Sequence, residues 1–88
     1  MPAAIYRIYT EAKNQRDIIR LAGKSFESFT LQPTLGYYEG KPEKSIVIEI
    51  VGAPEKDVNR LALRIGKMHG QKSVMVMRVQ GRAKTTRI

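Results

Sequence analysis

The order of strand-like and helix-like segments is the feature that most constrains the fold of this chain. Segments that alternate in hydrophobicity and are rich in β-branched or aromatic residues are interrupted twice by segments with a 3.6-residue period. We expect strands at residues 4–10, 26–31 with a continuation at 35–39, 44–51 and 72–79, and helices at 14–22 and 54–69. This β-α-β-β-α-β order predicts an α+β, ferredoxin-like domain: a four-stranded antiparallel sheet with both helices on one face.

Local signals support the boundaries of both helices. Asn14 is a favoured N-cap, and Gly23 suits the C-terminal exit of the first helix. Pro54 fits the first turn of the second helix, and acidic residues follow it at the positive end of the helix dipole. A turn is expected at residues 40–42 (Gly-Lys-Pro).

Size and composition narrow the remaining possibilities. A chain of 88 residues allows one domain with a thin core, which we place at residues 1–79, followed by a basic tail at 80–88. Because the chain contains no cysteine, it cannot use disulfides, cysteine metal sites or a thiol nucleophile. No apolar run is long enough to span a membrane and the start does not resemble a signal peptide, so the expected location is the cytoplasm.

Both faces of the predicted sheet are apolar. In the third expected strand Ile46, Ile48 and Ile50 share one face, while the last strand offers valines on one face and Met75 and Met77 on the other. Because the helices can cover one face, the open face should be covered by a partner, most simply a second copy of the chain. We therefore expect a homodimer or a larger homo-oligomer.

Two charged residues interrupt the apolar open face. Arg7 and Glu49 lie on the first and third strands, which are the two central strands of this fold. They should therefore be neighbours. Either they form an ion pair, or they line a ligand pocket at the interface between copies.

The net charge of +8 favours anionic partners. At 100° per residue, eight cations gather on the outer faces of the two helices, with no interspersed acids. They form either an ordinary solvated surface or a patch for phosphate groups. The candidate contacts for nucleic acid or an acidic protein are Lys13, Arg16, Arg20, Arg60, Arg64, Lys67, Arg82, Lys84 and Arg87.

The common catalytic motifs are missing from the sequence. It has no Walker or GxGxxG glycine loop, its single histidine, His69, has no second histidine for a metal site, and its serines lack a histidine–aspartate context. We therefore expect no enzyme activity, no cofactor and no metal.

The densest cluster of unusual residues spans residues 36–45 (GYYEGKPEKS). Tyr37 and Tyr38 can stack on a base, Glu43 can accept hydrogen bonds from ribose hydroxyls, and Ser45 can donate one. The alternative is a hairpin whose tyrosines pack on the edge of the sheet.

Five short motifs are distributed along the chain: Tyr-Thr-Glu at 9–11 with Asn14, FESFTL at 26–31, GYYEGKPEKS at 36–45, Ile-Glu-Ile at 48–50 and GQKSVMV at 70–76. With these motifs the chain resembles a group of small, mostly phage-encoded accessory proteins. This sequence has Tyr38 where the pattern usually has tryptophan, and Gly70 where it usually has asparagine.

The resemblance implies a phage accessory protein, and one class of such proteins sequesters nucleotide immune signals without converting them. A cyclic ADP-ribose isomer or a cyclic oligonucleotide is then the expected ligand. The candidate contacts are Arg7, Tyr9, Tyr37, Tyr38, Glu43, Ser45, Glu49 and Gln71. The alternatives are a basic nucleic-acid-binding protein and an inhibitor that binds an acidic host protein.

Overall fold

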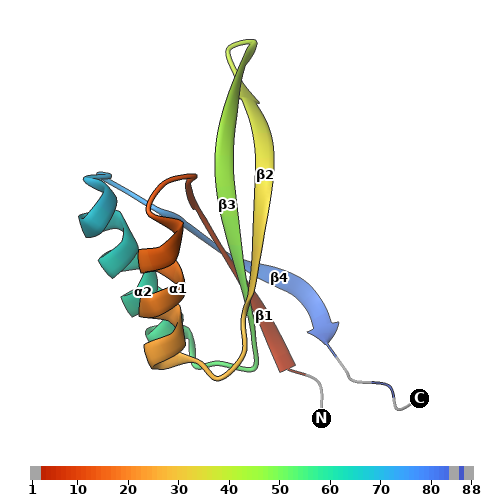
Figure 1. Ribbon diagram of the computed structural model, residues 1–88. Coiled ribbons are helices and arrows are strands. Elements are labelled where there is room, and N and C mark those ends of the chain that lie inside the picture. The colour runs from red at the N-terminus through yellow and green to blue at the C-terminus, as the bar shows by residue number, and fades with distance from the viewer. Residues whose placement is uncertain (1–2, 84–85, 87–88) are drawn as a thin grey trace.

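The computed structural model describes residues 3–83 and residue 86, with residues 81–83 described by their backbone alone. Figure 1 shows four strands and two helices in the predicted order. The elements are β1 (Ala3–Glu11), α1 (Gln15–Ser25), β2 (Thr30–Tyr38), β3 (Lys41–Val51), α2 (Glu55–His69) and β4 (Met75–Ala83).

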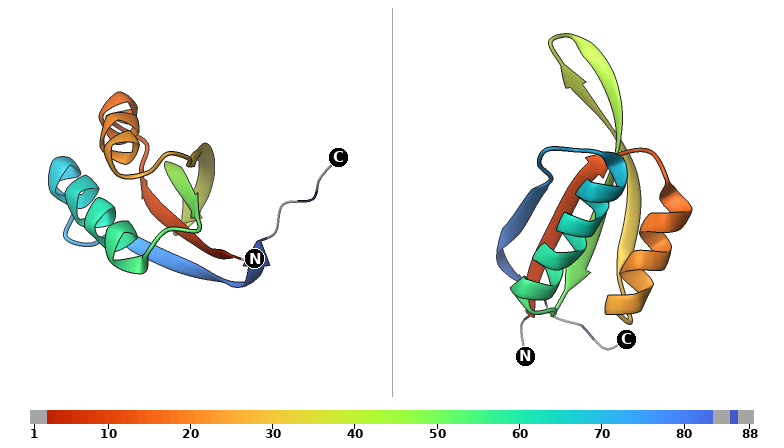
Figure 2. Two further views of the ribbon diagram at one scale, coloured as in Figure 1. Left: turned by 90° about the horizontal axis from the view of Figure 1, so that it is seen from below. Right: turned by 90° about the vertical axis from the view of Figure 1, so that its left-hand side faces the viewer.

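The strands form one antiparallel sheet in the order β2-β3-β1-β4. Both helices pack on the same face, and the other face has no helix over it (Figure 2). The ferredoxin-like arrangement predicted from the sequence is therefore confirmed.

The core lies between the helices and the covered face of the sheet. Ile8 of β1, Ile48 and Ile50 of β3, Ile18 of α1 and Ile65 of α2 are each at most 1% exposed. Burying a side chain of this size stabilises a fold by about 1.5–3 kcal/mol relative to leaving it in water. These isoleucines hold the two layers together.

The second strand and its turn differ from the prediction. β2 begins at Thr30 rather than at residue 26, and it continues through Pro33 without a break. Proline is tolerated there because β2 is an edge strand, where a missing N–H need not cost a ladder hydrogen bond. The chain reverses at Glu39 and Gly40, which both have positive φ angles (49° and 76°), rather than at residues 40–42. Such a two-residue turn matches the twist of a hairpin.

The last strand is longer than predicted and begins later. β4 starts at Met75 and runs to Ala83, so residues 80–83 belong to the sheet rather than to a tail. β1 and β4 pair up to Ile5 and Val79 and, after a register shift, again at Ala3 and Ala83, and this pairing overrides the polar composition of the segment. Of the cations placed in the tail, Arg82 lies in β4, while Lys84 and Arg87 lie outside the described residues.

The helix boundaries agree closely with the prediction, and α1 buries a narrow stripe of side chains. α1 buries Ile18 and Ala22, which are four positions apart, whereas Ile19 is 44% exposed. One residue corresponds to 100° of rotation, which carries Ile19 off the buried stripe. α2 ends at His69 and is capped by Gly70, whose left-handed φ of 70° suits glycine at this position.

β2 and β3 continue past the rest of the sheet as a two-stranded arm. β1 pairs with β3 as far as Ser45, so the part of β3 before it, from Lys41, pairs with β2 alone. Figure 1 shows this arm projecting beyond the helices.

Among the described residues, neither helix is long and apolar enough to cross a membrane.

Candidate ligand site on the open face of the sheet

The face of the sheet opposite the helices carries a row of apolar side chains around a charged centre. The alternation of the strands places on it Ile5, Arg7 and Tyr9 of β1, Val47, Glu49 and Val51 of β3, and Met75, Met77 and Val79 of β4. Val51, Met75 and Met77 are 49%, 54% and 40% exposed. The predicted two-sided apolar sheet is thus present.

Arg7 and Glu49 form the charged centre. They are direct cross-strand partners, and the Nε–H of Arg7 donates a 2.8 Å hydrogen bond to Oε2 of Glu49. Both side chains are partly exposed, at 39% and 35%. The Glu49 carboxylate, with a smaller contribution from the Tyr9 hydroxyl, raises the pKa of the Arg7 guanidinium above its ordinary value. The hydrogen bond thus directs the Nε edge of the charged Arg7 guanidinium towards Glu49.

This geometry leaves Arg7 able to bind an anion. A guanidinium has five N–H groups, and the bond to Glu49 uses the one on Nε. The terminal nitrogens can still form the paired hydrogen bonds by which arginine holds a phosphate. Tyr9 lies two positions along the same face, opposite Val47 and Met75, and adds an aromatic surface. The centre combines a cation, an acceptor and a ring.

Two more of the predicted contacts lie towards the arm. Ser45 is two positions from Val47 on the open face, and its hydroxyl forms a hydrogen bond with Thr34 across the hairpin. Glu43 is two positions further, opposite Gly36, where β3 pairs with β2 alone. Ser45 therefore borders the charged centre, and Glu43 lies outside it.

The two tyrosines of the hairpin are not brought to the charged centre within one chain. Tyr37 and Tyr38 lie at the tip of the arm and are 71% and 64% exposed. Tyr38 pairs with Lys41, which is eight residues from Glu49 along β3. At about 3.3 Å per residue the separation is roughly 26 Å, too far for one nucleotide to contact both groups.

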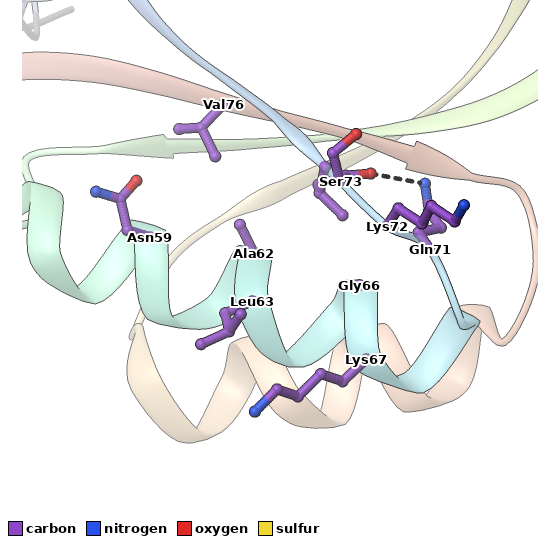
Figure 3. Close-up of a pocket in the computed structure, with 10 residues that line it drawn as sticks. Asn59, Ala62, Leu63, Gly66, Lys67, Gln71, Lys72, Ser73 and Val76 are labelled. Atoms are coloured by element: carbon purple, nitrogen blue, oxygen red, sulfur yellow. Dashed lines mark hydrogen bonds between the residues drawn. The ribbon is translucent and has the colours of Figure 1, made fainter.

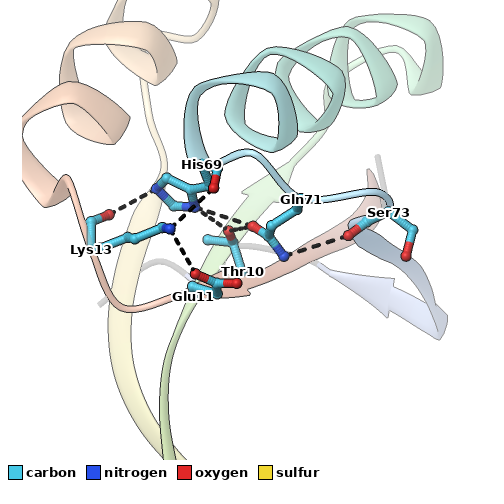
Figure 4. Close-up of polar contacts among 6 residues, drawn as sticks. All are labelled: Thr10, Glu11, Lys13, His69, Gln71 and Ser73. Atoms are coloured by element: carbon cyan, nitrogen blue, oxygen red, sulfur yellow. Dashed lines mark hydrogen bonds and ion pairs between the residues drawn. The ribbon is translucent and has the colours of Figure 1, made fainter.

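Gln71 belongs to a different polar cluster, at the end of α2 (Figure 4). Its Oε1 accepts a 2.7 Å hydrogen bond from the Thr10 hydroxyl and lies 3.1 Å from Nδ1 of His69. Thr10 is on the helix-covered side of β1 and is 3% exposed. Gln71 is thus engaged with neighbouring side chains and points away from Arg7 and Glu49 on the other face of the sheet.

His69 connects this cluster to the loop before α1. Its Nε2 donates a 2.9 Å hydrogen bond to the backbone carbonyl of Lys13, and the Lys13 ammonium donates to the carbonyl of His69. The sequence analysis placed His69 at the end of the second helix and did not predict these contacts. A signal was present, because His69 follows Leu61 and Ile65 at four-residue steps on the buried stripe of α2.

The cations on the helix faces are not free of acids, which corrects the prediction. Arg20 pairs with Asp17 at 3.0 Å and Arg60 with Asp57 at 3.9 Å, because residues three apart on a helix are neighbours. Lys13 pairs with Glu11 at 3.0 Å. Among the candidate phosphate contacts on the helices, those with no ion pair within residues 3–83 are Arg16, Arg64 and Lys67.

Clusters of acidic and histidine side chains with the geometry to hold a metal ion are absent from the described part of the chain. The predicted residues whose side chains the structure describes fall into four groups: the charged centre with Ser45 beside it, the arm, the cluster at the end of α2 and the helix cations.

Comparison with known proteins identifies the class of fold. No family model matches the sequence, and no curated protein matches it. Among solved structures, the chain is similar to GlnK of B. subtilis in its complex with ATP, with a TM-score of 0.58 and 23% identity over 89% of this chain and 82% of that one. This similarity supports the ferredoxin-like fold.

Proposed function

We propose that this protein binds a nucleotide-derived signal on the open face of its sheet and holds it without converting it. The observation that carries the proposal is the Arg7–Glu49 pair, fixed at 2.8 Å on a face that the helices leave uncovered. The fold is similar to that of GlnK, whose structure was determined with ATP, which supports a nucleotide as the class of ligand.

Each group of the charged centre has a role in this proposal. The terminal nitrogens of Arg7 bind phosphate oxygens, Tyr9 stacks on a base, and Glu49 and Ser45 exchange hydrogen bonds with ribose hydroxyls. Cyclic ADP-ribose isomers and cyclic oligonucleotides carry all of these groups. Sequestration of such an immune signal, as in the phage accessory proteins that the sequence resembles, is the biological role that we propose.

A second copy of the chain completes the proposed site. The exposed side chains of Met75, Met77 and Val51 surround the charged centre, so a ligand bound by one chain alone would remain open to water. A second copy on this face would bury them and exclude water from the ion pair, which strengthens its electrostatic interactions. Self-association through the open face is therefore part of the proposed function.

The test is a thermal-shift panel of cyclic dinucleotides, cyclic trinucleotides and cyclic ADP-ribose isomers, followed by titration calorimetry. We expect one class to raise the melting temperature, and Arg7→Ala to weaken its binding at least tenfold. The matched control is Arg16→Ala, which removes the same charge from the outer face of α1 and should leave binding unchanged.

Chromatography of the ligand recovered after denaturation separates sequestration from catalysis. Intact ligand supports the proposal, and a cleaved product would make the protein an enzyme. No shift with any member of the panel would contradict nucleotide binding altogether.

A further inference from the structure

The outer edge of β4 is a surface to which another strand can be added. The sheet has two edges, β2 and β4. β2 carries Pro33, which is one of the devices that protect an edge from unwanted pairing. From residue 75 to residue 80, β4 contains no proline, and its one charged residue is Arg78. Half of the N–H and C=O groups of an edge strand point away from the sheet, so β4 offers a template for backbone pairing.

A groove of about 270 Å³ runs beside this edge, between α2 and β4 (Figure 3). It exists because α2 carries small residues where it passes the strand: Ala62 and Gly66 line it, together with Val74 and Val76. A Cβ on Gly66 would lie 2.9 Å from a methyl group of Val74, so even alanine there would require one of the two to shift. Leu63, which is 59% exposed, forms the outer wall.

The shape of the groove suits side chains as its occupants. Its volume of about 270 Å³ is at the low end for pockets that enclose small molecules, and the groove is open along one side. In a strand added to β4, every second side chain would point towards the helix layer. Those side chains would enter the groove and meet its apolar lining.

The positive charges around the β4 edge favour an acidic partner over a second copy of the chain. Lys67 and Lys72 line the groove, and Arg78 is exposed on the helix side of β4, where it is the cross-strand partner of Tyr6. None of these three cations forms an ion pair with a residue in the described part of the chain. A second copy would bring the same three positive charges to the edge and be repelled, whereas an acidic segment would be attracted.

We propose that the β4 edge binds an extended acidic segment of a partner protein as a fifth strand. Apolar side chains of the segment fill the groove between α2 and β4, and its carboxylates pair with Lys67, Lys72 and Arg78. This surface is separate from the charged centre on the open face, so the inference does not depend on nucleotide binding.

The test uses a fluorescein-labelled peptide of about eight residues with threonine at every second position, and with valine and glutamate in turn at the positions between. One face of the added strand then carries both apolar and acidic side chains towards the groove and its cations. Anisotropy is the readout. One control peptide has two prolines that prevent strand formation at the same charge, and another has lysine in place of glutamate. We expect the first peptide to bind at least tenfold more tightly than either control. Amide hydrogen exchange should slow in β4 on binding and not in β2.

Matched protein variants locate the surface. Lys67→Glu combined with Lys72→Glu should weaken peptide binding at least tenfold. Arg16→Glu combined with Lys24→Glu changes the net charge equally on α1 and should have a much smaller effect. All four side chains are exposed, so both variants should fold, which circular dichroism checks.

Several results would overturn the proposal. Equal binding of the proline peptide, or equal loss in both double variants, would show a general electrostatic attraction without strand addition. No binding at millimolar peptide would exclude the site. If the β4 amides became more protected from hydrogen exchange as the protein concentration rose, without any peptide, the edge would bind a second copy of the chain instead.

Discussion

The two faces of the sheet have similar apolar composition but opposite environments. On β3, Ile48 and Ile50 point towards the helices and are at most 1% exposed. Glu49 and Val51 alternate with them and point to the open face, where Glu49 is partly exposed and Val51 is exposed. One strand thus serves the core with one set of residues and a candidate ligand surface with the other. The comparison teaches that hydrophobicity alone does not tell which face holds the fold together.

The difference between the faces is the presence of a second layer. α1 and α2 cover one face and exclude water from its centre, so the fully buried side chains there contribute their full burial energy. The open face has the Arg7–Glu49 pair at its centre instead of a helix. Substitutions should therefore affect stability on one face and binding or assembly on the other.

The largest expected effect is on the covered face. Ile48→Ala should lower the free energy of unfolding by about 2–5 kcal/mol, because it removes a fully buried side chain and leaves a cavity. Val51→Ala, three positions along the same strand on the open face, should cost under about 1 kcal/mol. Urea denaturation measures both. Equal losses in the free energy of unfolding would mean that the open face is buried in solution, and that the two faces do not differ in their contribution to stability.

A pair of glycines tests the packing of the helix layer in more detail. Gly66→Ala should destabilise the protein by about 1–3 kcal/mol, because the new methyl group would lie 2.9 Å from Val74. Gly23→Ala in α1 should stabilise it by up to about 1 kcal/mol, because nothing lies within 4 Å and alanine favours the helix. Thermal melts of the two variants should shift in opposite directions. A stabilising Gly66→Ala would show that α2 can move away from β4.

The fold was predictable because its signals are local and periodic. Alternation identified the strands, and the stripe of Leu61 and Ile65 identified α2. The ends of strands were less predictable, because pairing partners decide them. β4 continues to Ala83 through pairing with β1, and β2 tolerates Pro33 because it has no neighbour on one side.

The candidate site was predictable in part, for a reason of register. Arg7 and Glu49 could be placed together once β1 and β3 were known to be the central strands, because their faces follow from alternation. The distance from Glu49 to Tyr38 depends on where the hairpin turns, which the sequence prediction placed incorrectly. The Thr10–His69–Gln71 cluster joins residues from both ends of the chain, and no short motif predicts such a contact.

Assembly gives the next test of the open face. Met75→Lys places a charge on an exposed position of the open face, opposite Tyr9, and should weaken self-association about tenfold or more, because a second copy would have to bury it. Ile19→Lys adds the same charge on α1, in the helix layer, and should leave association unchanged. Light scattering over a micromolar concentration range measures both. A species of about 10 kDa in the unsubstituted protein at these concentrations would contradict self-association.

The smallest expected effect concerns the cations on the helix faces. Arg20 and Arg60 are paired with Asp17 and Asp57, which reduces the free positive charge on these faces. The helix faces should therefore bind duplex DNA weakly and without sequence preference, and the affinity should fall as the salt concentration rises. Removing Arg16 and Arg64 together by alanine substitution should lower the slope of log affinity against log salt by about two units.

Nucleotide binding by the same variant should not change, because both residues lie on the helix layer and Arg7 lies on the opposite face of the sheet. Fluorescence titrations at several salt concentrations measure the first effect and calorimetry the second. Loss of nucleotide binding in this variant would place the ligand on the helices and reverse the assignment of the two faces, whereas tight DNA binding with a steep slope would make nucleic acid the main partner.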